Sequence, residues 1–181
     1  MRHTKLHQRI SVTRLPQQRG ASLLEGIAYL GIAAIVVLGA VSLLTGAFSS
    51  AQSNRVVEEV ISIRTGVKKL YMGQASSYGA VSLNANLISA NVFPATLAVG
   101  AGAAVTNTWG GTVTVTGAGS AFTIAYTLVP TDACINIISG ASGWTSIASG
   151  GAGITVFPAT PAAAALECTG AAANTITWTS P

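Results

Sequence analysis

A long apolar segment near the N-terminus dominates the hydropathy pattern of this 181-residue chain. From Gly26 to Phe48 the chain has 23 consecutive residues without a charge. As an α-helix, a segment of this length extends for about 35 Å, which is enough to cross a bilayer core of about 30 Å. The pattern therefore predicts one transmembrane helix, over residues 23–48.

The helical pattern continues beyond this segment with a different character. Apolar residues recur at close to helical spacing: Val56, Val57, Val60, Ile61, Val67, Leu70 and Tyr71. The charged residues are assigned to the other faces: Glu58, Glu59, Arg64, Lys68 and Lys69. We predict one helix over residues 21–74, apolar all round in its first half and amphipathic in its second. Gly39, Gly46 and Gly66 favour close packing of this helix against others.

Residues 75–181 have a different composition and predict a globular domain. Residues 111–129 alternate apolar and polar positions around a glycine-containing break, which predicts the two strands of a hairpin. Two further strands are expected at residues 153–157 and 174–179. Together with the long helix, these strands predict an α+β fold in which the helix packs on an antiparallel sheet.

A short helix is expected to begin near Cys134. Thr131 or Asp132 precedes an apolar stretch there, and either side chain has the chemistry of an N-cap. The three tryptophans of the chain, Trp109, Trp144 and Trp178, are expected to be core residues rather than a receptor-binding patch, because isolated tryptophans among strands usually pack inside.

The positive charge of the chain is concentrated at its start. The formal net charge is +4, but residues 1–20 hold five of the nine basic residues, both histidines and no acid. Only Arg55 follows soon after the apolar segment. This asymmetry predicts a cytoplasmic N-terminus and export of the rest of the chain.

Export would place the two cysteines, Cys134 and Cys168, in an oxidising compartment. In an oxidising compartment, two cysteines of a small domain more often pair than stay free. A disulfide closing a loop of this length would contribute roughly 3–4 kcal/mol in the chain-entropy description.

The sequence offers little for an enzyme or for a cofactor. No histidine follows residue 20, no phosphate-binding loop is present, and the glycine-rich segments 100–105 and 117–122 lack the third glycine of a dinucleotide fingerprint. Two cysteines and two distant acids do not compose a zinc or calcium site. A disulfide would bring Asp132 and Glu167 into one neighbourhood, but a helix cap and a solvated side chain explain this pair better than acid/base catalysis.

Glu25 stands at the edge of the apolar segment, where a carboxylate costs roughly 3 kcal/mol or more unless it has a partner. Cleavage between Gly20 and Ala21 would create an amino group one helical turn away, on the same chain or on a neighbour. The attraction between the amine and the carboxylate is comparable to the cost of burial. The alternative is a simple membrane anchor with an incidental glutamate.

The basic leader, Gly20, Glu25 and the apolar run together resemble the class III signal of type IV pilins and pseudopilins. The leader of twenty residues and the first residue Ala21 resemble the type IVb branch. "RGASLLEGIAYLGI" and "SIRTGVKKLY" look most similar to the major prepilins of thin pili encoded by conjugative plasmids.

This resemblance implies roles for individual residues. Gly20 would precede the cut by prepilin peptidase, Ala21 would be the N-methylated mature terminus, and Glu25 would recruit the next subunit during assembly. Cys134 and Cys168 would form the disulfide that bounds the variable region of pilins. The implied division is a cleaved leader over 1–20, a long helix over 21–74 and a globular pilin domain over 75–181.

The resemblance also implies a function as the major prepilin of a type IVb pilus. The precursor would reside in the inner membrane, use the pilus assembly machinery there, and polymerise into a helical homo-oligomer, the extracellular fimbrium. The filament would serve adhesion to a host cell or stabilisation of mating pairs with a recipient cell. Two alternatives are a pseudopilin of type II secretion and a membrane-anchored monomeric binding domain.

The charged side chains suggest one further contact between subunits. All basic residues after the leader belong to the predicted helix: Arg55, Arg64, Lys68 and Lys69. An acidic spot formed by Asp132 and Glu167 is expected to meet this basic band on a neighbouring subunit. Contact with nucleic acid is the weaker interpretation, because no aromatic residues are interleaved with the basic ones.

Overall fold

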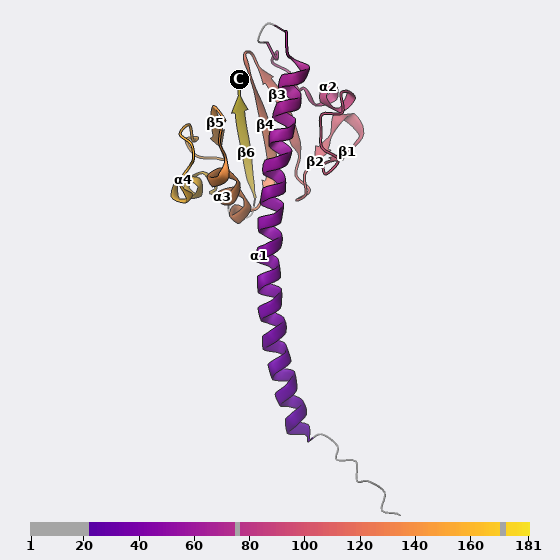
Figure 1. Cartoon of the computed structure of the whole chain (residues 1–181), viewed down its shortest axis with the longest axis vertical. Helices are drawn as coiled ribbons and strands as arrows, with labels where there is room; N and C mark the ends of the chain where they lie inside the picture. Colours follow the sequence, from indigo (N-terminus) through magenta and orange to yellow (C-terminus); the bar gives the residue numbers. More distant parts are fainter. Residues whose placement is uncertain (1–21, 75–76, 171–172) are drawn as a thin grey trace, which may run out of the picture. The chain divides into compact units, whose positions relative to one another are not determined.

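The computed structural model of this chain describes residues 22–74, 77–170 and 173–181. The chain separates into two compact units, residues 1–42 and 43–181. Helix α1, Leu23–Leu70, begins in the first unit and ends in the second (Figure 1). It ends four residues before the predicted Gln74, in a turn over residues 71–73. Its predicted start at Ala21 lies outside the described residues.

The second unit contains a four-stranded antiparallel sheet, and its strands lie side by side in Figure 1 in the order β3-β4-β6-β5. The bounds are β3 Val113–Ala118, β4 Ala121–Val129, β5 Ser146–Ala148 and β6 Asn174–Ser180. Strands β3 and β4 form the predicted hairpin, and β6 covers the predicted strand at 174–179. Ile124 of β4 pairs with Val115 on one side and Trp178 on the other. The α+β prediction is confirmed.

The strand predicted at residues 153–157 is wrong. Only Ile154 makes a ladder contact there, an isolated bridge to Ile147. Gly153 has a φ of +83°, and its N–H donates to the carboxylate of Glu167 instead of to a neighbouring strand. The N–H of Gly153 is therefore bound to a side chain, and the pairing of this segment with β5 is limited to Ile154.

Several short elements were not predicted. They are α2 Asn84–Ser89, β1 Ala98–Val99, the 3-10 turn Ala101–Ala103, β2 Val105–Thr106 and α4 Pro161–Glu167. Strands β1 and β2 pair with each other as a separate ribbon. Helix α4 begins with a regular cap, since the hydroxyl of Thr160 accepts from the N–H of Ala163 at 3.2 Å.

Helix α3, Thr131–Gly140, is the short helix expected near Cys134. Its predicted cap is wrong, because Pro130 occupies the N-cap position and no side chain caps the helix. The hydroxyl of Thr131 donates to the carbonyl of Gly170 at 2.7 Å, and the carboxylate of Asp132 accepts from Ser49. Both side chains that were expected to cap the helix instead form hydrogen bonds with residues far away in the sequence.

The core of the second unit lies between the second half of α1 and the sheet. The buried apolar residues of α1 are Val56, Val60, Ile63 and Val67. Facing them are alternate residues of the strands, including Phe122, Ile124 and Tyr126. Trp144 and Trp178 are buried and Trp109 is half-buried against this core, as expected of core tryptophans.

Both edges of the sheet have hydrogen-bonded partners. Along β3, the N–H of Leu83 donates to the carbonyl of Val115 at 2.8 Å, and the N–H of Gly117 donates to the carbonyl of Val81 at 3.0 Å. Along β5, Ile147 exchanges two hydrogen bonds with Ile154. Because exposed edges are the sites where strands of other chains add, these contacts disfavour association through the sheet.

Gly66 packs closely against Val92, since a Cβ added at Gly66 would lie 2.3 Å from Cγ1 of Val92. We expect Gly66→Ala to lower the free energy of unfolding by about 1–3 kcal/mol, since overpacking outweighs the gain of about 1 kcal/mol in helix propensity. The measurement is the unfolding midpoint of the detergent-solubilised chain, followed by near-UV circular dichroism.

Gly39→Ala is the matched control in the same helix, because a Cβ at Gly39 meets nothing within 4 Å. It is expected to leave the midpoint unchanged or raise it. Equal midpoints for the two variants would contradict the packing explanation for Gly66.

Candidate functional site

The part of α1 that belongs to the first unit is apolar on every side. Its large side chains are exposed, among them Leu23 at 82% and Leu30 at 72% of their surface. Among the described residues, α1 is the one helix that is long and apolar enough to cross a membrane. An apolar surface of this extent requires cover by lipid or by other protein.

Glu25 lies in the first turn of this apolar helix, and it is exposed. Its N–H donates to the hydroxyl of Ser22 at 3.3 Å, and its carboxylate accepts from the hydroxyl of Tyr29 at 3.4 Å. Ser22 and Glu25 have the spacing of a capping box, a helix-start signal that the sequence analysis did not use. A carboxylate is favoured at a helix N-terminus by the helix dipole.

The described residues bring no cation to Glu25, since their one ion pair joins Arg55 to Glu59. Gly20 and Ala21, which carry the predicted cleavage site and methylated terminus, lie outside the described residues. The pairing of Glu25 with a new amino group therefore stays a prediction.

Cys134 and Cys168 form a disulfide, with their Cα atoms 6.0 Å apart, as the sequence predicted. It joins α3 to the residue that follows α4.

Glu167, next to the disulfide, is 4% exposed, so its interpretation as a solvated side chain is wrong. Its carboxylate accepts three backbone hydrogen bonds, from Ser149 at 2.9 Å, Gly151 at 3.2 Å and Gly153 at 2.7 Å. A buried charge is tolerated when such donors replace water. Glu167 therefore anchors the loop 149–153 and is not available to an exposed acidic spot.

Asp132 is exposed, and its carboxylate accepts from the hydroxyl of Ser49. This hydrogen bond lowers the pKa of Asp132, because it favours the charged form. The contact ties α3 to α1. The two carboxylates near the disulfide thus hold different segments, which gives no support to a paired acid/base site.

The four basic residues of the expected band have different surroundings in the structure. The Arg64 guanidinium lies 4.7 Å from the centre of the Trp144 ring, and its Nε donates to the hydroxyl of Ser180 at 3.0 Å. Arg55 lies 3.8 Å from Glu59. Lys69 is exposed and Lys68 is half-buried, and neither contacts an acid among the described residues. Arg55 and Arg64 thus have partners within the domain, whereas the two lysines have no ion-pair partner among the described residues.

Glu59 was assigned to an exposed face, and this prediction is wrong, because its side chain is 4% exposed. Its carboxylate accepts from the hydroxyls of Thr96 at 2.5 Å and Tyr126 at 3.4 Å. Its position three residues after Val56 and four before Ile63 places it on the buried stripe, which was a usable signal. Burial, with the nearby Glu59 carboxylate, raises the pKa of Tyr126.

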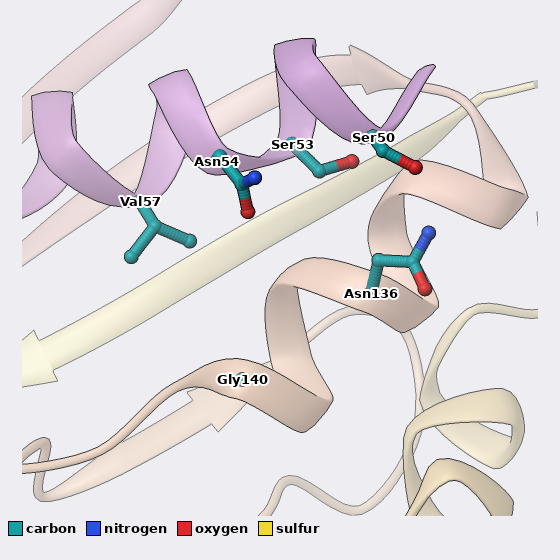
Figure 2. A pocket seen from close by; sticks show the side chains of 6 residues that line it. All are labelled: Ser50, Ser53, Asn54, Val57, Asn136 and Gly140. Atoms are coloured by element: carbon teal, nitrogen blue, oxygen red, sulfur yellow. The ribbon is translucent and has the colours of Figure 1, made fainter. Parts of the chain in front are cut away.

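A groove of about 370 Å³ lies between α1 and α3 (Figure 2). Its lining residues are Ser50, Ser53, Asn54, Val57, Asn136 and Gly140. Amides and hydroxyls face it, without an acid or a base that could activate a nucleophile. Within the described part of the chain, no three potential metal ligands cluster. The arrangement suits polar contact and not catalysis.

Comparisons with known proteins agree with this picture. The family described as PilS N terminal matches residues 50–181. The crystal structure of a type IVb pilin from Salmonella typhi is similar, with a TM-score of 0.55 and 25% sequence identity, over 67% of this chain and 95% of that one. No match was found among curated protein sequences.

The contact between Tyr126 and Glu59 predicts that the stability of the folded chain decreases at alkaline pH. In the folded chain the pKa of Tyr126 is raised, so the unfolded chain loses this proton first, near pH 10. The unfolded state then binds fewer protons, and stability falls as pH rises above 10, by about 1.4 kcal/mol per pH unit from this residue. Urea midpoints of the detergent-solubilised chain at pH 8, 10 and 11 measure this slope.

Tyr126→Phe serves as the comparison. It should be less stable than the wild type at pH 8, because Glu59 loses a hydrogen-bond donor, by about 1–3 kcal/mol. Its loss of stability between pH 10 and 11 should be shallower. Parallel slopes for the two proteins would show that Tyr126 does not carry the effect.

Proposed function

This chain belongs to the PilS family of type IVb pilins, and from that premise we propose that it is the major prepilin of a type IVb pilus. A pilin is a structural subunit, and its family assembles as a filament of identical chains. The exposed apolar surface of α1 carries the proposal, because a bilayer covers it in the precursor and the helices of other copies cover it in the filament.

The proposed maturation begins at the inner membrane. Prepilin peptidase cuts between Gly20 and Ala21, and Ala21 is then N-methylated. The new amino group supplies the cation that Glu25 lacks among the described residues. When the carboxylate enters an apolar filament core, this pairing offsets its cost of burial, which favours addition of a subunit that carries both groups.

The second unit supports exposure on the outside of a pilus. The disulfide Cys134–Cys168 links its helices, and both edges of its sheet have hydrogen-bonded partners. Such a domain can be displayed at high local concentration without strand exchange between copies.

The proposed use of the filament is adhesion to a host cell or stabilisation of mating pairs with a recipient cell. The similarity of "RGASLLEGIAYLGI" to thin-pilus prepilins of conjugative plasmids supports the second use. A type II secretion pseudopilin shares the leader and the helix, but it would form short assemblies in the periplasm and not abundant extracellular filaments.

Intact mass spectrometry of protein sheared from the outside of expressing cells tests the proposal. We expect a chain that begins at Ala21, carries one methyl group and is two hydrogens lighter because of the disulfide. A processed chain confined to the membrane would favour the pseudopilin. An uncleaved chain that begins at Met1, with an empty sheared fraction, would overturn the pilin proposal.

The role of Glu25 has its own test. Glu25→Gln keeps the size of the side chain and removes its charge, so the chain should be cleaved but should yield at least tenfold less sheared filament. Glu25→Asp retains the charge and should preserve more assembly than Glu25→Gln. Equal yields from Glu25→Gln and the wild type would show that the charge is not needed.

A further inference from the structure

One side of α1 in the second unit is exposed among the described residues. The helix buries Val56, Val60, Ile63 and Val67 against the domain. The exposed residues opposite to them form what we call the outer stripe: Glu58, Ile61, Ser62, Thr65 and Lys69. Glu58, Ser62, Thr65 and Lys69 follow each other at intervals of four, three and four residues. This is the spacing of a stripe that packs against another helix.

The charged residues of the outer stripe have no ion-pair partner among the described residues of the second unit. Among the described residues of the second unit, the other charged groups have partners, except Lys68. Glu58 and Lys69 have no hydrogen-bond or ion-pair partner there, and both point away from the core. They are eleven residues apart on one face, which is about three turns or 16 Å along the axis.

We propose that the outer stripe is an interface between copies of this chain, in which Glu58 of one copy pairs with Lys69 of a second copy. The second copy is displaced by about three helical turns, or 16 Å, along the helix axis. This inference rests on the proposed function as a filament subunit. It replaces the expected contact between the lysines and a spot containing Glu167, whose carboxylate is buried.

In a filament of parallel copies, the charge pattern selects the stagger. Two parallel copies in register would place Glu58 beside Glu58 and Lys69 beside Lys69, which is repulsive. A displacement of three turns brings opposite charges together and so specifies the register, as interhelical charges do in coiled coils.

The uncharged part of the stripe fits the same occupant. Ser62 and Thr65 are small, so two helix backbones can approach closely between the charges. Ile61 is 51% exposed in the single chain and would lose that exposure against a second helix. Both edges of the four-stranded sheet already have hydrogen-bonded partners, which disfavours association through these edges.

A competing explanation assigns the lysines to the C-terminal end of α1, where cations compensate the helix dipole. Lys68 and Lys69 are both in the last turn, so this explanation predicts the same effect for reversal of either one. The interface predicts different effects, because Lys68 lies about 80° around the helix from Glu58, whereas Lys69 lies within about 20°. Lys68→Glu is therefore the matched control for Lys69→Glu.

The test measures the yield of sheared filaments for charge reversals. We expect Glu58→Lys and Lys69→Glu each to lower the yield about tenfold, and the double variant Glu58→Lys/Lys69→Glu to return it to within about twofold of the wild type. Lys68→Glu should retain the wild-type yield. Near-UV circular dichroism of each detergent-solubilised variant checks that the domain is folded.

A second measurement uses the wild-type filament. A zero-length carbodiimide should join Glu58 to Lys69, and peptide mass spectrometry would detect the linked pair. Because the two side chains are about 16 Å apart on one helix, such a link can only join two copies. Membrane-embedded precursor treated in the same way should give no link.

The outcomes separate the two proposals. Wild-type filaments with an unrestored double variant, or without the Glu58–Lys69 link, would overturn the interface and leave the pilin function standing. Equal losses for Lys68→Glu and Lys69→Glu would also overturn it, in favour of the dipole explanation. A wild type that makes no filaments would overturn the proposed function and the interface with it.

Discussion

An α-helix that is apolar on every side cannot remain exposed to water, and this constraint governs the first unit of the protein. Among the described residues, nothing covers most of its large side chains. A bilayer and a bundle of similar helices are both adequate environments, because both remove apolar surface from water and leave the backbone bonded within the helix. The same apolar surface therefore suits both the membrane-bound precursor and the filament of the proposed function.

The buried polar side chains that the structure describes in the second unit all have hydrogen-bond partners. Glu59 and Glu167 are buried, yet each has hydrogen-bond donors in place of water, and Arg64 lies over Trp144. The edges of the sheet have hydrogen-bonded partners as well. A domain of this kind has few strong sites for unintended association. The contacts left for assembly belong to the helix, where Glu58 and Lys69 stand on its uncovered face.

This arrangement suits a mechanical function better than a chemical one. The groove between α1 and α3 offers amides and hydroxyls, and none of its lining residues is an acid or a base. Asp132 ties α3 to α1, and Glu167 holds a loop beside the disulfide. The charged residues of the domain thus act chiefly as structural links.

The sequence by itself determined the long helix, the hairpin at 111–129 and the pairing of the cysteines, because each depends on periodicity or compartment. The leader over 1–20 stays a prediction. The sequence also predicted Glu25 as an assembly residue, although the capping box with Ser22 went unused. Tertiary structure alone decided the hydrogen-bond partners of Glu59, Arg64 and Glu167, since these partners lie far away in sequence. The burial of Glu59 could have been predicted from its place on the buried stripe. The strand expected at 153–157 did not form, because Glu167 binds the backbone N–H of Gly153. Local pattern shows which residues can be buried, but only the packed chain shows which donors are close enough to make a buried charge stable.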